Sequence, residues 1–220
     1  ALLKQFTVLP SVYRTIQTAG TGESIIADRI APVTDNLPDN YKVAFLPNLG
    51  KVRVRLGAYG ENIDALKSDL DKRVAEVVAL IPELVFGYDA QSLESVLGDV
   101  LREKELKLAT AESCTGGYLG HRITSVAGSS TYYMGGVVAY ANAVKIDKLD
   151  VAASDIEKNG AVSEEVVIAM AKGAIARFQT DIGIGISGIA GPGGGTEDKP
   201  VGTIWLAIAN DKNAVSYKLQ

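Results

Sequence analysis

Cysteine and histidine are almost absent from this sequence, whose 220 residues include one of each, Cys114 and His121. A single cysteine cannot form an intrachain disulfide, which fits a protein of the reducing cytoplasm. With so few thiol and imidazole ligands, a zinc site of the Cys/His type is excluded, and we expect neither a metal nor another cofactor. A Ser-His-Asp triad would have to use His121.

Long apolar runs and an excess of basic charge are missing as well. No run approaches the roughly 20 apolar residues of a membrane-spanning helix, and we expect no signal peptide in the opening residues ALLKQ, which lack a basic start and an apolar stretch. The net charge of −4 and the pI near 5.1 disfavour binding to a phosphate backbone, which depends on clustered Lys and Arg. We therefore expect no membrane partner and no nucleic-acid partner.

The hydrophobic pattern predicts two units, a small α+β unit over residues 1–90 and a larger one over 91–220. Val52, Val54 and Leu56 alternate with two arginines, as in a half-buried strand. The first unit is predicted to contain a strand over 6–18 broken near Pro10, a helix opening near 21–24, paired strands over 41–46 and 52–59, and a helix from 63 to 78. Residues 86–91 are predicted to form a linker.

The second unit alternates predicted helices and strands, which is typical of an α/β fold with a sheet covered by helices. Ser92 is a plausible cap for its first helix, and a capping box at 154–157 precedes a helix predicted over 163–178. The remaining elements are strands over 106–111, 135–140, 182–187 and 202–209, a helix over 115–126 and a short helix near 142–149.

The motif AESCTGG at 111–117 places Ser113 between an apolar run and a helix-like run. At a strand-to-helix turn, unpaired backbone N–H groups and the positive end of the helix dipole favour a negatively charged oxygen. Ser113 is therefore a candidate nucleophile for acyl transfer. Equally, Ser113 or Thr115 could simply cap the helix.

A serine nucleophile needs a base, and His121 cannot supply it. His121 follows Ser113 by eight residues, which is about 12 Å along a helix. A lysine whose pKa is lowered by burial can take a serine proton, and Lys145 follows a predicted strand end. The spacing alone leaves open that Lys145 is a surface lysine. Cys114 is an alternative nucleophile, because a thiol at a helix N-terminus can ionise more easily.

The segment SGIAGPGGGT at 187–196 is rich in glycine. Its start completes a literal G-x-G-x-x-G match, but the following Gly and Pro residues cannot comfortably open the helix that a dinucleotide site requires. We interpret the segment as a buried strand ending in a glycine loop. Such a loop lets a ligand approach backbone amides, so Ser187, Gly188 and Ile189 are candidate substrate contacts. A turn without a ligand is the alternative.

Five segments in order (AESCTGG, GGVVAYANAVK at 135–145, GAVSEE at 160–165, SGIAGPGGGT and KPVGT at 199–203) closely resemble the C-terminal domain of the CinA (competence/damage-inducible) family, the nicotinamide-mononucleotide amidohydrolases. The resemblance covers about residues 92–220. Residues 1–90 resemble the family's middle domain through RTIQTAGTGES at 14–24 and VRVRL at 52–56. This resemblance implies a three-layer α/β/α domain preceded by a smaller KH-like α+β domain.

The resemblance further implies a metal-independent Ser/Lys hydrolase that converts nicotinamide mononucleotide to nicotinate mononucleotide and ammonia, with Ser113 as nucleophile and Lys145 as base. Tyr140 could orient the lysine or carry a proton. If Lys145 were not the base, Tyr140 or Glu112 would be the next candidate for that role. Backbone N–H groups near Thr115 and Gly116 would stabilise the oxyanion. Gly117 and Asn142 are further candidate substrate contacts, and we expect a homo-oligomer.

Compared with the family pattern, the chain is expected to be a fragment. It would lack an N-terminal nucleotide-hydrolysing domain and a C-terminal turn and helix that carry a phosphate-binding arginine, so it would be weakly active or inactive. Two other function classes remain. One is a regulatory module that binds a nucleotide without turnover. The other is an RNA-binding protein that uses its first unit, where Gly57-Ala-Tyr-Gly60 fits a GXXG motif but follows a predicted strand.

Overall fold

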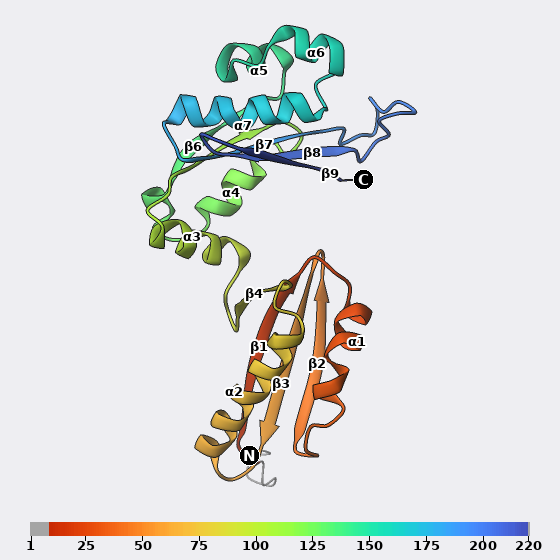
Figure 1. The fold of residues 1–220 in the computed structure, drawn as a ribbon, viewed down its shortest axis with the longest axis vertical. Helices are drawn as coiled ribbons and strands as arrows, with labels where there is room; N and C mark the ends of the chain where they lie inside the picture. Colours follow the sequence, from red (N-terminus) through yellow and green to blue (C-terminus); the bar gives the residue numbers. More distant parts are fainter. Residues whose placement is uncertain (1–8, 220) are drawn as a thin grey trace, which may run out of the picture. The chain divides into compact units, whose positions relative to one another are not determined.

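A computed structural model describes residues 9–219 and divides the chain into two compact units (Figure 1). The first unit ends at Val96 and the second begins at Leu97, so the boundary falls within the helix α3 (Leu93–Glu103), most of which belongs to the second unit. The beginning of the strand predicted over 6–18 lies outside the described residues. Its described part starts at Ser11, directly after Pro10. No helix within residues 9–219 is long and apolar enough to cross a membrane.

The first unit is an antiparallel sheet with the strand order β2-β3-β1-β4 and two helices. Its elements are β1 (Ser11–Ala19), α1 (Glu23–Thr34), β2 (Tyr41–Asn48), β3 (Lys51–Tyr59), α2 (Ile63–Leu80) and β4 (Val85–Tyr88). Figure 1 shows α1 and α2 beside the sheet. The mixed α+β fold that the sequence predicted for this unit is confirmed.

The alternation predicted for β3 decides how this unit forms its core. Val52, Val54 and Leu56 are 3%, 0% and 0% exposed, and they pack with Leu70 and Val77 of α2. Burying such a side chain contributes about 1.5–3 kcal/mol. Gly57 lies within β3, and Gly60 follows it in the turn before α2. The GXXG match is thus the end of a strand and a turn.

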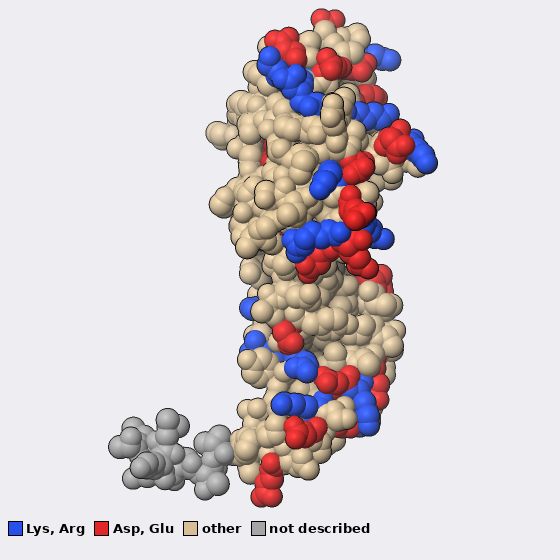
Figure 2. Space-filling model, turned by 90° about the vertical axis from the view of Figure 1, so that its left-hand side faces the viewer, with Lys and Arg blue, Asp and Glu red and all other residues tan. Residues whose placement is uncertain are grey.

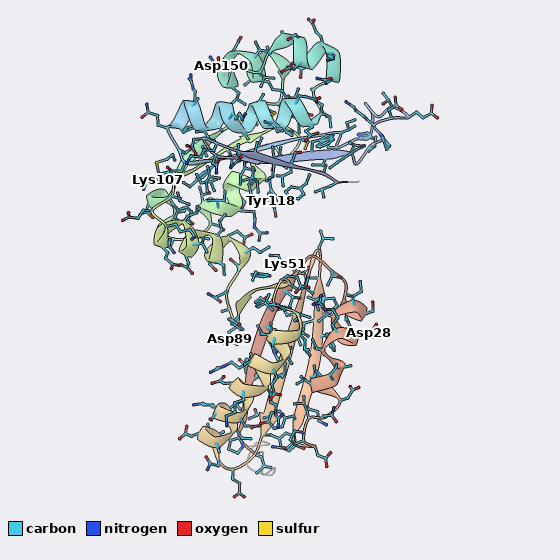
Figure 3. The ribbon with its side chains drawn as sticks, in the orientation of Figure 1. Asp28, Lys51, Asp89, Lys107, Tyr118 and Asp150 are labelled. Carbon is cyan, nitrogen blue, oxygen red and sulfur yellow. The ribbon has the colours of Figure 1, made fainter. Side chains whose placement is uncertain are left out.

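The linker predicted over 86–91 is wrong in part, because Val85–Tyr88 forms the edge strand β4. β4 pairs antiparallel with β1. Asp89, labelled in Figure 3 beside this strand, holds the pairing, since its carboxylate accepts from Thr15 N (3.0 Å) and its carbonyl from Gln17 Nε2 (2.5 Å). Residues that were predicted to form a linker therefore add the edge strand of the first sheet.

The second unit contains a five-stranded sheet with the order β6-β5-β7-β8-β9. β6, β5 and β7 are parallel, whereas β8 and β9 are antiparallel to their neighbours. Its elements are α3 (Leu93–Glu103), β5 (Leu108–Glu112), α4 (Tyr118–Thr124), a 3-10 turn (Ser129–Thr131), β6 (Tyr133–Val138), α5 (Asn142–Leu149), α6 (Ala153–Asn159), α7 (Glu164–Phe178), β7 (Ile182–Gly188), β8 (Ile204–Ala209) and β9 (Ala214–Leu219).

Helices cover both faces of this sheet, as expected for an α/β/α fold. Figure 1 shows α7 on one face with α5 and α6 outside it, and α3 and α4 on the other. α7 approaches β7 closely because two strand residues are glycines. A Cβ on Gly183 would lie 2.1 Å from Ala171 O, and a Cβ on Gly185 would lie 2.2 Å from Val167 O. The literal G-x-G-x-x-G match therefore serves helix packing.

Three local predictions for the second unit need correction. The helix predicted over 115–126 begins only at Tyr118, because Gly116 and Gly117 have positive φ angles of 60° and 96° and form a turn. The capping box at 154–157 lies inside a separate short helix, α6, whose preceding residue makes no side-chain cap. β9 was not predicted. In contrast, the Ser92 cap is confirmed, since Ser92 Oγ accepts from Ser95 N at 3.1 Å.

Candidate functional site

Ser113 follows the central strand of the parallel part of the sheet. β5 lies between β6 and β7, so Ser113 lies at the carboxyl edge, where α/β sheets bind their ligands. Ser113 N donates to Ile186 O of β7 (2.9 Å). Lys107 and Tyr118, labelled in Figure 3, mark the two ends of the segment that contains β5 and its turn. The strand and the turn thus fix the Ser113 backbone.

Glu112, the last residue of β5, caps α4. Its carboxylate is 2% exposed and accepts from Leu119 N (2.9 Å), Gly120 N (2.8 Å) and Thr115 Oγ1 (2.7 Å). Three donors compensate for burying this charge. The predicted role of the helix N-terminus is therefore corrected, because Glu112 rather than a Ser113 oxyanion uses these N–H groups. Ser113 and Thr115 are not caps that accept from the helix.

Lys145 of α5 brings its ammonium nitrogen to the serine. Lys145 Nζ lies 3.2 Å from Ser113 Oγ, 2.8 Å from Ala139 O and 3.3 Å from Tyr140 O. Lys145 is 1% exposed and Ser113 is 7% exposed. The two residues are 32 positions apart in the chain, and β6 together with the start of α5 joins them.

The environment of Lys145 favours the neutral amine. Burial lowers the pKa of Lys145 from its ordinary value, with only a smaller opposing effect of Cys114. A neutral amine has two N–H donors and one lone pair. In the structure Lys145 Nζ donates to Ser113 Oγ, Ala139 O and Tyr140 O. In the neutral form the two carbonyls can accept its N–H groups, which leaves the lone pair for the hydroxyl proton of Ser113. The surroundings therefore match a lysine that accepts a proton from serine.

Ser113 and Lys145 both line a cavity of about 280 Å³. The walls come from the turn after β5, the start of α5, the loop between α6 and α7, and the glycine loop after β7. The lining residues are Ser113, Cys114, Tyr140, Asn142, Lys145, Ala161, Val162, Ser187, Gly188, Ile189, Ala190, Gly191, Gly193 and Gly194. Lys145 is the only cation in this lining, which consists otherwise of small side chains, backbone and a few neutral polar groups.

The structure separates the predicted substrate contacts into two groups. Asn142, Ser187, Gly188 and Ile189 line the cavity, although Ser187 Oγ is already engaged with Ala161 O (2.8 Å). Tyr140 lines it too, with a side chain 76% exposed, and it touches Lys145 through its backbone carbonyl.

Thr115, Gly116 and Gly117 do not belong to the cavity lining. The Thr115 hydroxyl donates to Glu112, and Gly116 N donates to Ser113 O (3.1 Å). A Gly116 N–H that already has this acceptor is a poor oxyanion donor. The structure therefore contradicts Gly116 N as an oxyanion donor and leaves Thr115, Gly116 and Gly117 in a turn outside the cavity lining.

Two walls of the cavity were missed as contacts. Ala161 and Val162 come from the segment GAVSEE, which carried the family resemblance but had no predicted role. Gly191, Gly193 and Gly194 extend the glycine loop beyond the predicted Ile189. Gly191 and Gly194 have positive φ angles of 80° and 87°. The glycines themselves are the sequence signal that could have indicated a sharply folded loop there.

The two other candidate groups, Cys114 and His121, lack the surroundings that would make them catalytic. Burial raises the pKa of the Cys114 thiol, which favours the uncharged form. His121 is exposed on α4, with its ring 6.1 Å from that of Tyr118. Across residues 9–219, no three His, Cys, Asp or Glu side chains lie close enough together to hold a metal ion. On the face in Figure 2, basic and acidic side chains are interspersed.

Comparison with known families gives two matches along the chain. The model described as "CinA C-terminal domain" matches residues 90–220, and the model described as "Damage-inducible protein CinA KH domain" matches residues 13–87. A CinA-like protein of Cytophaga hutchinsonii is 48% identical over 209 residues, covering 95% of this chain and 50% of that protein. One from Amoebophilus asiaticus is 41% identical, covering 100% and 53%. The chain thus spans about half the length of these curated relatives.

Solved structures resemble part of the chain. A competence/damage inducible protein from Agrobacterium tumefaciens has a TM-score of 0.56 and 37% identity, covering 57% of this chain and 77% of that one. A CinA superfamily protein from Escherichia coli has a TM-score of 0.56 and 36% identity, covering 58% and 74%.

Proposed function

Since this chain belongs to the CinA family, whose two domain models match residues 13–87 and 90–220, we propose that its second unit is a serine-dependent amidohydrolase. The proposed reaction converts nicotinamide mononucleotide and water to nicotinate mononucleotide and ammonia. The observation that carries this proposal is the buried contact between Ser113 Oγ and Lys145 Nζ, which lies in a cavity wall.

The proposed chemistry begins with the neutral Lys145 amine. It takes the proton of Ser113 while the serine oxygen attacks the carboxamide carbon, which forms a tetrahedral oxyanion. Lys145 then returns that proton to the departing nitrogen, so that ammonia leaves and an ester remains on Ser113. Water attacks the ester, again with Lys145 as base, and nicotinate mononucleotide is released.

The oxyanion needs donors other than Gly116. Cys114 N, the backbone donor that follows the nucleophile, donates to no backbone carbonyl in the described part of the chain, although the Cys114 thiol accepts from this N–H and from Thr115 N. A backbone N–H in this position stabilises the oxyanion in many serine hydrolases. We assign this donor to Cys114 N. Loss of one such donor typically costs about 10²–10³ in rate.

The cavity also bears on how a mononucleotide would bind. Because Lys145 is the only cation in the lining and is used as the base, the described residues offer the phosphate mainly backbone amides. Gly191, Gly193 and Gly194 line the cavity without side chains, which allows a close approach of phosphate oxygens to backbone N–H groups. The proposed orientation places the carboxamide at Ser113 and the phosphate along the glycine loop.

Ammonia release from nicotinamide mononucleotide tests the function directly. We expect the wild-type chain to release ammonia and the Ser113→Ala variant to lose at least about 10³-fold in kcat, because the nucleophile is gone. Ser125→Ala, which removes an exposed hydroxyl at the C-terminal end of α4, is the matched control and should behave as wild type. Binding of the mononucleotide without ammonia release, measured by calorimetry, would instead identify a regulatory module.

A further inference from the structure

The loop between α6 and α7 is held by side chains through every one of its carbonyl groups from Asn159 to Val162. This loop forms one cavity wall through Ala161 and Val162. The bonds are Lys199 Nζ to Asn159 O (2.6 Å), Ser163 Oγ to Gly160 O (2.9 Å), Ser187 Oγ to Ala161 O (2.8 Å) and Lys199 Nζ to Val162 O (2.9 Å). A loop whose carbonyls are all bonded in this way is well defined without regular secondary structure.

Lys199 supplies two of these four bonds from the opposite wall. It belongs to the segment that continues the glycine loop after β7. A tight turn fixes its backbone, because Thr196 N donates to Lys199 O (2.9 Å) and Lys199 N donates to Thr196 Oγ1 (3.1 Å). The Lys199 side chain therefore connects the glycine loop to the loop between α6 and α7.

A cation is well suited to this position. Asn159 is the last residue of α6, and the final carbonyls of a helix lack intrahelical partners and carry a partial negative charge. The ammonium group satisfies one of them and reaches Val162 O beyond it. Gly160 suits this turn because its φ angle is 75°, a conformation that favours glycine.

We infer that Lys199 is a positioning residue that sets the distance between the two walls of the cavity and thereby the affinity for the substrate. This inference rests on the proposed function for its kinetic part. Lys199 is not part of the cavity lining, so it acts through Ala161 and Val162 on one side and the glycine loop on the other. The Ser113–Lys145 contact does not involve it.

The test replaces Lys199 by methionine, which keeps an unbranched side chain shorter by one atom and removes the two bonds. We expect KM to rise roughly 10- to 100-fold, with kcat within about threefold because the chemical groups are untouched. Lys199→Arg should recover much of the affinity, since a guanidinium can donate to two carbonyls. Lys158→Met, an exposed lysine in the last turn of α6, is the control and should match wild type.

Two measurements separate positioning from direct substrate binding. Nicotinamide riboside lacks the phosphate, so a positioning role, which acts on the wall of Ala161 and Val162 as well as on the glycine loop, raises KM for the riboside as well as for the mononucleotide. A rise for the mononucleotide alone would mean that Lys199 binds phosphate and would overturn the inference.

Hydrogen exchange of the substrate-free chain tests the positioning role of Lys199 without an activity assay. In Lys199→Met, backbone amides over 160–163 and 189–203 should exchange faster than in wild type and in Lys158→Met. Unchanged exchange there would contradict the inference. If the wild-type chain releases no ammonia, the proposed function fails, and the exchange experiment still decides whether Lys199 holds the two loops together.

Discussion

The two units use their buried polar side chains in different ways. In the first unit they are neutral and join strands, as in the bond from Thr18 Oγ1 to Val52 O (2.6 Å). In the second unit two ionisable side chains, Glu112 and Lys145, are 2% and 1% exposed. Glu112 has three donors that account for its burial. Lys145 has no carboxylate partner among the described residues.

This difference marks Lys145 as a candidate functional group. A buried cation without an opposite charge destabilises the folded state, and such groups gather at functional sites. Buried neutral groups that are fully hydrogen-bonded carry no comparable cost. If Lys145 is a buried lysine kept for proton transfer, its variants should change activity more than variants of the first unit do.

Among the variants that test this comparison of the two units, the largest effect should come from Lys145→Arg. A guanidinium keeps the positive charge but cannot give up its proton near neutral pH, so we expect kcat for ammonia release to fall by about 10²-fold or more. Lys148→Arg, an exposed lysine on the same helix, is the matched control. A Lys145→Arg variant with near-wild-type kcat and only a raised KM would mean that Lys145 merely holds the substrate by charge.

Much of the framework could be predicted from local pattern. The alternation in β3 identified one side of the first core, the helix predicted from 63 to 78 corresponds to α2, and the strand-to-turn position of Ser113 followed from AESCTGG. The short helix near 142–149 was also predicted correctly. β4 was missed because four residues that include Gly87 carry little strand signal, and its pairing with β1 is a long-range contact.

The site was less predictable because its contacts join distant segments. The spacing alone left Lys145 as a surface lysine, and only the family resemblance favoured it. Its burial depends on the crossover from β5 through β6 to α5. Glu112 caps amides seven and eight residues ahead, which is not the spacing of a local capping box. Ser187 was expected to contact substrate, but its hydroxyl donates to Ala161 O. The sequence did not predict this bond, because the position of Ala161 O depends on the packing of α7.

The next prediction concerns the pH dependence of stability, for which the two units have opposite signs. The pKa of Lys145 is lowered by burial from 10.5, so the unfolded state binds more protons between the lowered pKa and about 10.5. Stability from this residue therefore rises with pH in that window, by at most about 1.4 kcal/mol per pH unit. Burial, with the bond to Asp69, raises the pKa of Tyr41 in the first unit to about 12, so its contribution falls above pH 10.

Denaturant unfolding of wild type and Lys145→Met between pH 7 and 9.5 measures the first effect. The methionine variant lacks the titrating group and leaves Ala139 O without its donor, so its absolute stability is not the readout. We expect the free energy of unfolding of wild type, relative to the variant, to increase with pH. A difference that stays constant over this range would mean that Lys145 is protonated in the fold and is not a free base.

A smaller effect is expected from Cys114→Ala. Cys114 packs against Gly188, since a Cβ on that glycine would lie 2.9 Å from its sulfur, and burial favours the neutral thiol. We therefore expect ammonia release within about threefold of wild type, because the backbone N–H of residue 114 is retained. The opposite pattern, an inactive Cys114→Ala and an active Ser113→Ala, would make the thiol the nucleophile and remove the Ser/Lys mechanism.

The smallest effect should come from the surface charge of the first unit. Arg14 Nε of β1 donates to Asp71 Oδ1 of α2 (2.8 Å), with side chains 41% and 54% exposed. Exposed pairs of this kind are worth about 0.2–1 kcal/mol, so Arg14→Met should lower the free energy of unfolding by no more than that and leave ammonia release unchanged. Denaturant unfolding and the ammonia assay on the same preparation measure both quantities. A large loss of activity without a loss of stability would show that the first unit acts on the site, and the functional division between the units would no longer hold.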